Sequence, residues 1–134
     1  MRMGIITLVS VAALAACDGD SDVAESKMER EAETQAIAAG PTEAALGLSE
    51  AQLLEAELVG RGNIDIGDVV KVERDASGKV DRLLIEIEDS NPDRFVYVPI
   101  SKLKPILRGT ETDLEADMTL AELRALPEVK LPAH

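Results

Sequence analysis

Residues 58–103 read LVGRGNIDIGDVVKVERDASGKVDRLLIEIEDSNPDRFVYVPISKL. Polar turns at 75–79 and 89–93 separate three runs that are rich in aliphatic and β-branched residues. The runs are Asp68–Arg74, Val80–Glu88 and Phe95–Pro99. Apolar and polar residues alternate along them, which is typical of strands that bury one face. The stretch therefore predicts a twisted antiparallel meander with one face in solvent, and a fold that is mainly β.

The alternation also assigns side chains to the two faces of this meander. Residues two apart on a strand point to the same side of the sheet. Leu83, Ile85 and Ile87 are predicted to face the core in the middle run, and Val70 and Val72 in the first run. The chain has one Phe, one Tyr and no Trp, so the core must be built from aliphatic side chains.

Two capping boxes predict short helices on either side of the meander. Ser49 with Gln52, and Thr119 with Glu122, place a hydroxyl three residues before a side chain that can reach back to the backbone. Pro127 ends the second helix. We expect the first helix to pack on the sheet and the second to cap one end of it.

The amino terminus has the features of a secretory signal peptide. An apolar run, Ile5–Ala16, follows Met1 and Arg2, and it is too short to span a bilayer comfortably. It ends in Leu14-Ala15-Ala16-Cys17, which resembles the lipobox of bacterial lipoproteins. The resemblance implies that Cys17 carries the lipid. We therefore expect a lipid-anchored protein of the bacterial cell envelope that faces the periplasm, with the choice of inner or outer membrane left open.

Charge divides the chain near residue 60. Residues 17–60 hold eleven acidic residues against two basic ones, whereas residues 61–109 hold nine of each. An acidic, self-repelling segment before a balanced one predicts a solvated arm joined to a folded module. Within the arm we expect disorder at 18–24 and a marginal, exposed helix at Glu25–Ala39. The net charge of −12 argues against nucleic acid as a partner.

Four segments are predicted along the chain. They are a signal peptide at 1–16, an acidic tether at 17–48 that is partly helical or disordered, a β module at 49–109, and a capping helix and tail at 110–134. The module is long enough to fold alone with a modest stability margin.

The order and spacing of several short motifs resemble one known family. The motifs are Leu58–Arg61, Ile66–Val70, Asp75 with Gly78 to Val80, Leu83–Ile87, Val96–Pro99 and Leu103. Together they are similar to the PRC-barrel domain, which is named for the photosynthetic reaction-centre H subunit and also occurs in a ribosome maturation factor. The resemblance implies a small antiparallel barrel, or an open meander, that docks or helps assemble a partner protein without catalysis.

No catalytic constellation is predicted. The single histidine is the last residue, His134, and the single thiol belongs to Cys17, which is expected to carry the lipid. The residues needed for a Ser–His or Cys–His catalytic pair are therefore missing. Glu86 and Glu88 share a strand face and could form an acid–base pair. Four basic residues lie on neighbouring runs, and ion pairs to them explain the same pattern: Lys71, Arg74, Arg82 and Arg94. No cofactor is expected.

Arg94, Phe95 and Tyr97 are the candidate partner-binding residues. Phe95 and Tyr97 point to the same face of their strand. Aromatic and arginine side chains are enriched where proteins dock. Packing in the core or at the mouth of a barrel is the alternative interpretation of the two aromatic residues, and the sequence leaves both open.

The acidic run just after Cys17 was compared with the pattern of a calcium-binding loop. Asp18, Asp20 and Asp22, with Glu29 further on, partly match a calcium-binding loop, but Val23 stands where such a loop needs a glycine. We therefore predict no metal site. Weak binding of cations by the acidic arm remains the alternative function.

Overall fold

The computed structural model describes residues 19–131, and every structural statement below refers to this range. The helices are α1 (Gly19–Ala39), α2 (Glu50–Glu55) and α3 (Leu120–Arg124), with a 3-10 turn η1 at Ile100–Lys102. The strands are β1 (Glu43–Ala45), β2 (Leu48–Ser49), β3 (Glu57–Gly60), β4 (Ile64–Arg74), β5 (Val80–Ile87), β6 (Phe95–Pro99), β7 (Leu103–Arg108) and β8 (Glu111–Ala116). The predicted signal peptide and Cys17 lie outside the described residues. None of the helices described is long and apolar enough to cross a membrane.

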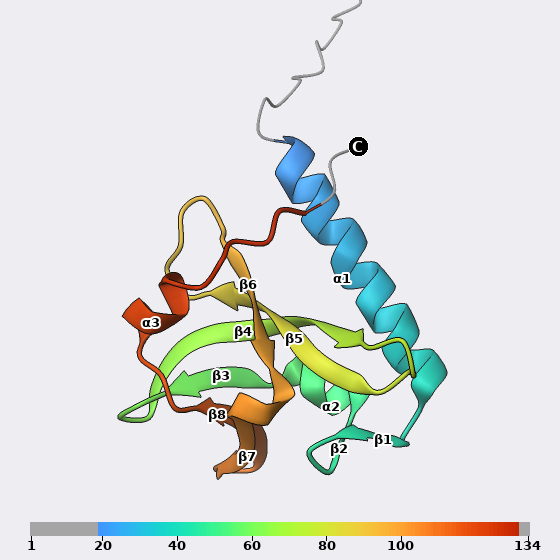
Figure 1. Cartoon of the computed structure of the whole chain (residues 1–134). Coiled ribbons are helices and arrows are strands. Elements are labelled where there is room, and N and C mark those ends of the chain that lie inside the picture. The colour runs from blue at the N-terminus through green and yellow to red at the C-terminus, as the bar shows by residue number, and fades with distance from the viewer. Residues whose placement is uncertain (1–18, 132–134) are drawn as a thin grey trace, which may run out of the picture.

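One six-stranded sheet organises the fold, in the order β6-β5-β4-β3-β8-β7 (Figure 1). Its β4-β5-β6 part is the antiparallel meander that the sequence predicts, with β6 at the predicted bounds. The prediction that the whole sheet is antiparallel is wrong, because β3 and β8 pair in parallel. Among the described strands no pairing joins the two edges, β6 and β7, so the sheet is open and forms no closed barrel.

Two strands extend the sheet beyond the predicted meander. The sequence predicts a short turn at 101–103, and η1 forms there at Ile100–Lys102. The prediction that Pro105 ends this segment is wrong, because the chain continues through Pro105 as β7 and returns as β8. A proline is tolerated in this position because β7 is an edge strand, which has one side without a partner. β8 then inserts between β7 and β3, so residues after 110 belong to the same sheet as the meander.

A register shift in β4 places Val70 on the face opposite to the predicted one. Val69 pairs with Ile85 and Lys71 with Leu84, so Val70 is an extra residue between successive pairs. An extra residue of this kind is a β-bulge, and it breaks the alternation of faces. Val72 packs in the main core as predicted, whereas Val70 belongs to a second cluster on the opposite face of the sheet.

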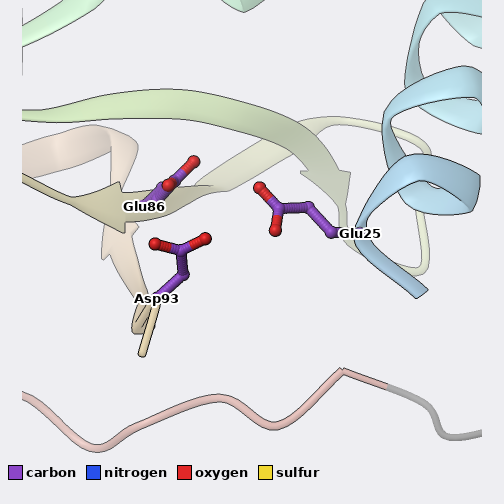
Figure 2. Close-up of side chains that lie close together, drawn as sticks. All are labelled: Glu25, Glu86 and Asp93. Carbon is purple, nitrogen blue, oxygen red and sulfur yellow. The ribbon is translucent and has the colours of Figure 1, made fainter. Parts of the chain in front are cut away.

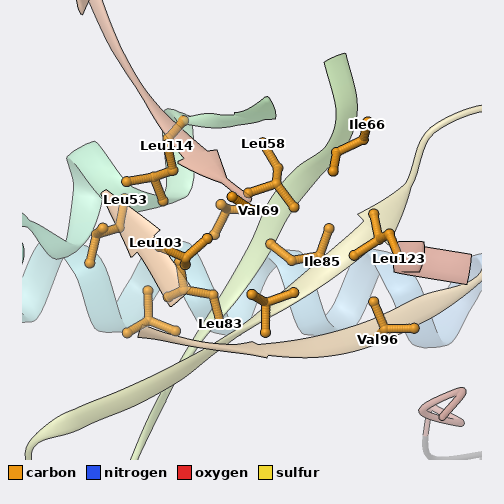
Figure 3. Packing of buried hydrophobic residues seen from close by; sticks show 14 of the residues in the cluster. Leu53, Leu58, Ile66, Val69, Leu83, Ile85, Val96, Leu103, Leu114 and Leu123 are labelled. Atoms are coloured by element: carbon orange, nitrogen blue, oxygen red, sulfur yellow. The ribbon is translucent and has the colours of Figure 1, made fainter. Parts of the chain in front are cut away.

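The main core lies on one face of the sheet, beneath α2 and α3. Figure 3 shows fourteen of its side chains, which are aliphatic throughout the labelled set. The meander side chains predicted to face this core do so: Leu83, Ile85 and Ile87. Both predicted helix starts are confirmed. Ser49 and Gln52 form the complete capping box of α2, and the Thr119 hydroxyl accepts from the Glu122 backbone N–H at the start of α3.

The opposite face of the meander is covered rather than solvated. Helix α1 lies along it (Figure 1), with four side chains buried at intervals of four residues: Ala24, Met28, Ala32 and Ala36. The helix predicted at Glu25–Ala39 is confirmed and ends at Ala39, but it is not exposed, because it buries one side. The disorder expected at 18–24 is wrong for the described residues, because α1 already begins at Gly19. Alanines add little to an apolar pattern, yet they allow a helix to approach a sheet closely.

A second, smaller apolar cluster fills the space beneath α1. Met28, Val70, Leu84 and Phe95 form it, and Tyr97, Val129 and Leu131 pack against its edge. The segment that follows α3 crosses the end of β6, where the Val129 N–H donates to the Phe95 carbonyl at 2.7 Å. Helix α1 and the C-terminal segment thus cover this face from two sides.

Candidate functional site

A groove of about 250 Å³ lies between α1, the sheet and the C-terminal segment. Its apolar walls come from Met28, Leu84, Tyr97, Val129 and Leu131, which belong to three parts of the chain that are distant in sequence. Charged side chains also line it, namely Lys27, Glu31, Lys71, Glu73 and Lys130. The groove contains one of the three residues predicted to bind a partner, and it is the candidate docking site.

Tyr97 is held in a fixed orientation inside this groove. Its ring lies under the Arg82 guanidinium, which is 3.8 Å from the ring centroid. Its hydroxyl lies 3.5 Å from the Glu73 carboxylate, at the long end for a hydrogen bond, and Glu73 in turn pairs with Lys71 at 3.4 Å. A cation over a ring and a partnered hydroxyl both favour one rotamer. The half-buried ring therefore presents a preformed surface to the groove.

Phe95 and Arg94 lie in different surroundings from Tyr97. Phe95 is buried in the second cluster, beneath the strand-like contact with Val129. Arg94 is half-buried, and its Nε atom is shielded from solvent with no hydrogen-bond partner among the described residues. Of the three residues predicted to bind a partner, Tyr97 lines the groove, whereas Arg94 and Phe95 do not.

Three carboxylates meet beside α1, as Figure 2 shows. Glu25 comes from α1, Glu86 from β5 and Asp93 from the loop before β6, and one oxygen of each lies within 4.8 Å of the others. Acidic side chains often gather at this spacing without an ion, and no further observation on the described residues points to a ligand. We therefore assign no metal ion to this acidic cluster.

Within this cluster the pKa of Glu86 is raised. Partial burial, followed by repulsion from Glu25 and Asp93, raises the pKa of Glu86 from 4.5 to about 7. Asp68 and Glu29 act in the same direction. The charged groups with the largest effects on this carboxyl are acidic, so its ionised form is disfavoured.

The sequence interpretation expected Glu86 and Glu88 to be neutralised by neighbouring bases. Three of the four bases have other partners in the structure: Lys71 pairs with Glu73, Arg74 pairs with Glu50, and Arg82 lies over Tyr97. Glu86 instead faces the acidic residues of the cluster. The difference arises because α1 covers this face, which the sequence interpretation left in water.

Sequence reasoning missed Glu25 as a member of any site. The signal that could have identified it is the four-residue spacing of Ala24, Met28, Ala32 and Ala36, which defines the side of α1 that docks. Glu25 directly follows the first of these residues, so it lies at the border of the docked side. Its position opposite Glu86, however, depends on how the helix packs against the sheet.

Comparison with protein-family models and with curated proteins found no match to this chain.

Proposed function

We propose that the chain is a lipid-anchored protein of the bacterial cell envelope whose six-stranded module docks a partner protein without catalysis. The observation that carries this proposal is the groove around Tyr97. Its volume of about 250 Å³ is at or below the lower end for pockets that enclose small-molecule ligands. It suits one or two side chains of a partner, which is the usual scale of a binding hot spot.

The chemistry of the groove defines what such a partner presents. Leu84, Met28 and Leu131 offer an apolar surface, and Lys130 is exposed beside them. A partner segment with an apolar side chain next to an acidic one would match both features. Three lysines and two glutamates line the groove, so it is slightly basic although the whole chain carries a net charge of −12, and this local charge favours an acidic contact.

The start of α1 supports docking close to the membrane. Gly19, the first residue of the helix, is two positions after the predicted lipidation site Cys17. The 21 residues of α1 extend about 31 Å at 1.5 Å per residue. A helix packed on the sheet limits the reach of the module far more than a flexible arm would, so a lipid on Cys17 would keep the groove near the membrane.

Crosslinking in native membranes tests this proposal. A photoreactive residue would replace Tyr97 in the full chain, and a matched variant would carry it at Thr110, which is exposed in the turn between β7 and β8. We expect a discrete protein, identified by mass spectrometry, to be captured from position 97 and lost when Cys17→Ser removes the anchor. Equal capture from position 110, or no captured protein, would contradict the proposal.

Binding of the purified partner then tests the groove itself. Lys130→Glu should weaken binding about tenfold, because it reverses a charge on the groove wall. Lys102→Glu reverses an exposed charge on η1, and it should leave the affinity unchanged. Equal effects of the two substitutions would show that net charge, and not the groove, governs binding.

The alternative function, weak binding of cations by the acidic segment, stays a prediction. If it is correct, calcium titrated into the full chain should bind, and deletion of residues 18–40 should abolish this binding. Heat of binding that survives this deletion would count against the alternative and leave the docking proposal untouched.

A further inference from the structure

Strand β6 is an edge of the sheet, and the hydrogen bonds around it identify which of its backbone groups point outward. The Ile87 N–H donates to the Arg94 carbonyl at 2.9 Å, so this carbonyl points toward β5. Backbone groups alternate in direction along a strand, and β5 and β6 pair without a register shift. The N–H and C=O groups of Phe95 and Tyr97, and the C=O group of Pro99, therefore point away from the sheet.

The C-terminal segment pairs with this edge at Phe95, where the Val129 N–H donates to the Phe95 carbonyl in an antiparallel bridge. Continuation of this pairing would place Pro127 opposite Tyr97. A proline has no N–H to donate, so the pairing stops at Val129. Within the part of the chain that the structure describes, no backbone hydrogen bond is found on the outward side of Tyr97. The edge thus accepts an extended chain at Phe95 and leaves the next outward pair of groups open.

The open backbone groups and the groove belong to the same residue. The Tyr97 ring lines the groove, next to Leu84 of β5. Side chains of directly opposed residues on neighbouring strands lie on the same face of a sheet. A chain that paired with the Tyr97 backbone would therefore direct the side chain of its paired residue to the face that holds the groove.

The chemistry around Tyr97 defines the segment that fits. A donor and an acceptor at strand spacing match the backbone of an extended peptide, which adds to an edge as a further strand. Residues two apart on such a peptide share a face. The Arg82 guanidinium lies over the Tyr97 ring on this face, so an acidic side chain two residues from the paired one would find a cation beside it.

We propose that the partner adds an extended segment to β6 at Tyr97, with an apolar side chain directed into the groove and an acidic side chain two residues away beside Arg82. The C-terminal segment keeps its place at Phe95, so Lys130 remains on the groove wall. The segment of the partner and the C-terminal segment then occupy consecutive parts of one edge. This inference rests on the proposed function and adds to it the form in which the partner is recognised.

Synthetic peptides titrated into the full chain, followed by NMR, test the pairing. The probe is acetyl-Thr-Leu-Thr-Glu-Thr-amide. We expect it to shift the signal of the Tyr97 amide and to slow its hydrogen exchange, while the amide of Leu107, on the other edge strand β7, does not respond. A methyl group on the leucine nitrogen removes the donor to the Tyr97 carbonyl and should weaken binding about tenfold. A methyl group on the nitrogen of the central threonine, which points away from β6, is the matched control and should have little effect.

The acidic side chain of the probe is tested separately. Glutamine in place of the glutamate should weaken binding about threefold, because the charge beside Arg82 is lost. Equal affinities of the two methylated peptides, or no response of Tyr97 to the probe, would overturn the proposal. Capture of a protein by crosslinking from position 97 would still stand in that case, and it would show that the partner docks through side chains alone. A response of Tyr97 to the probe without any captured protein would support the edge as a strand-binding site and count against the proposed function.

Discussion

The Glu50 carboxylate is almost fully buried at the start of α2, and it accepts a hydrogen bond from the Arg74 guanidinium at 2.5 Å. Glu50 is the first residue of α2 and Arg74 is the last residue of β4, so this ion pair fixes α2 on the sheet. Removal of the cation would leave a buried charge without its partner. We expect Arg74→Ala to lower the free energy of unfolding by about 2–3 kcal/mol, which urea denaturation would measure.

Arg124→Ala is the matched control for this substitution. Arg124 is exposed in the last turn of α3, and its loss should change stability by no more than about 0.5 kcal/mol. In the double variant with Glu50→Gln, the effect of Arg74→Ala should shrink, because the buried charge is gone. Equal losses in Arg74→Ala and Arg124→Ala would show that the buried pair does not hold α2.

Leu123 fixes α3 on the other end of the main core. Its side chain is fully buried, and truncation to alanine would leave a cavity beneath the helix. We expect Leu123→Ala to lower the free energy of unfolding by about 2–4 kcal/mol. Leu107→Ala serves as the control, because Leu107 is 78% exposed and should cost less than about 0.5 kcal/mol. A small loss at Leu123 would mean that α3 contributes little to the fold.

Gly67 permits close contact between β4 and β5. A Cβ atom at this position would lie 2.6 Å from the Ile85 side chain and 2.8 Å from the Glu86 carbonyl oxygen. Relief of this clash requires movement of the backbone, so Gly67→Ala should cost about 2–3 kcal/mol. Gly109→Ala meets open space and strains only a φ of 67°, which should cost about 1 kcal/mol. Thermal unfolding of both variants would test this order, and a reversed order would contradict it.

Much of the meander could be predicted from its local pattern. Strand β6 and both helix caps occur at the predicted positions because alternation and capping are local signals. Strand β8 could not be found in this way, since its parallel pairing with β3 joins Leu58 to Leu114 across a long stretch of chain. The bulge at Val70 was missed because one inserted residue leaves the apolar pattern almost intact.

The candidate site was harder to predict than the fold. Tyr97, one of the predicted partner-binding residues, lines the groove, but the residues that contact it, Arg82 and Glu73, come from two other strands. The acidic cluster depends on α1, which the sequence interpretation placed in solvent because alanines carry a weak apolar signal. Charge repulsion across an interface is a property of packing, and no local pattern encodes it.

The raised pKa of Glu86 predicts how stability changes with pH. Its folded-state value of about 7 exceeds the ordinary value of 4.5, so between these two pH values the folded chain binds a proton that the unfolded chain has lost. The contribution of this group to stability is therefore complete below about pH 4.5, and it is lost as the pH rises to about 7. Glu86→Gln cannot ionise and removes this dependence.

Urea denaturation of the unmodified chain and of Glu86→Gln at pH 5 and pH 8 would measure the effect. At pH 5 the loss has only begun, so the two chains should differ much less in stability than they do at pH 8. At pH 8 Glu86→Gln should be more stable by about 1 kcal/mol, a figure reduced for partial exposure and solvent screening. Asp81→Asn should show no such gain, because Asp81 is exposed and lies outside the acidic cluster. A gain that is the same at both pH values would mean that packing, and not ionisation, explains the effect of Glu86.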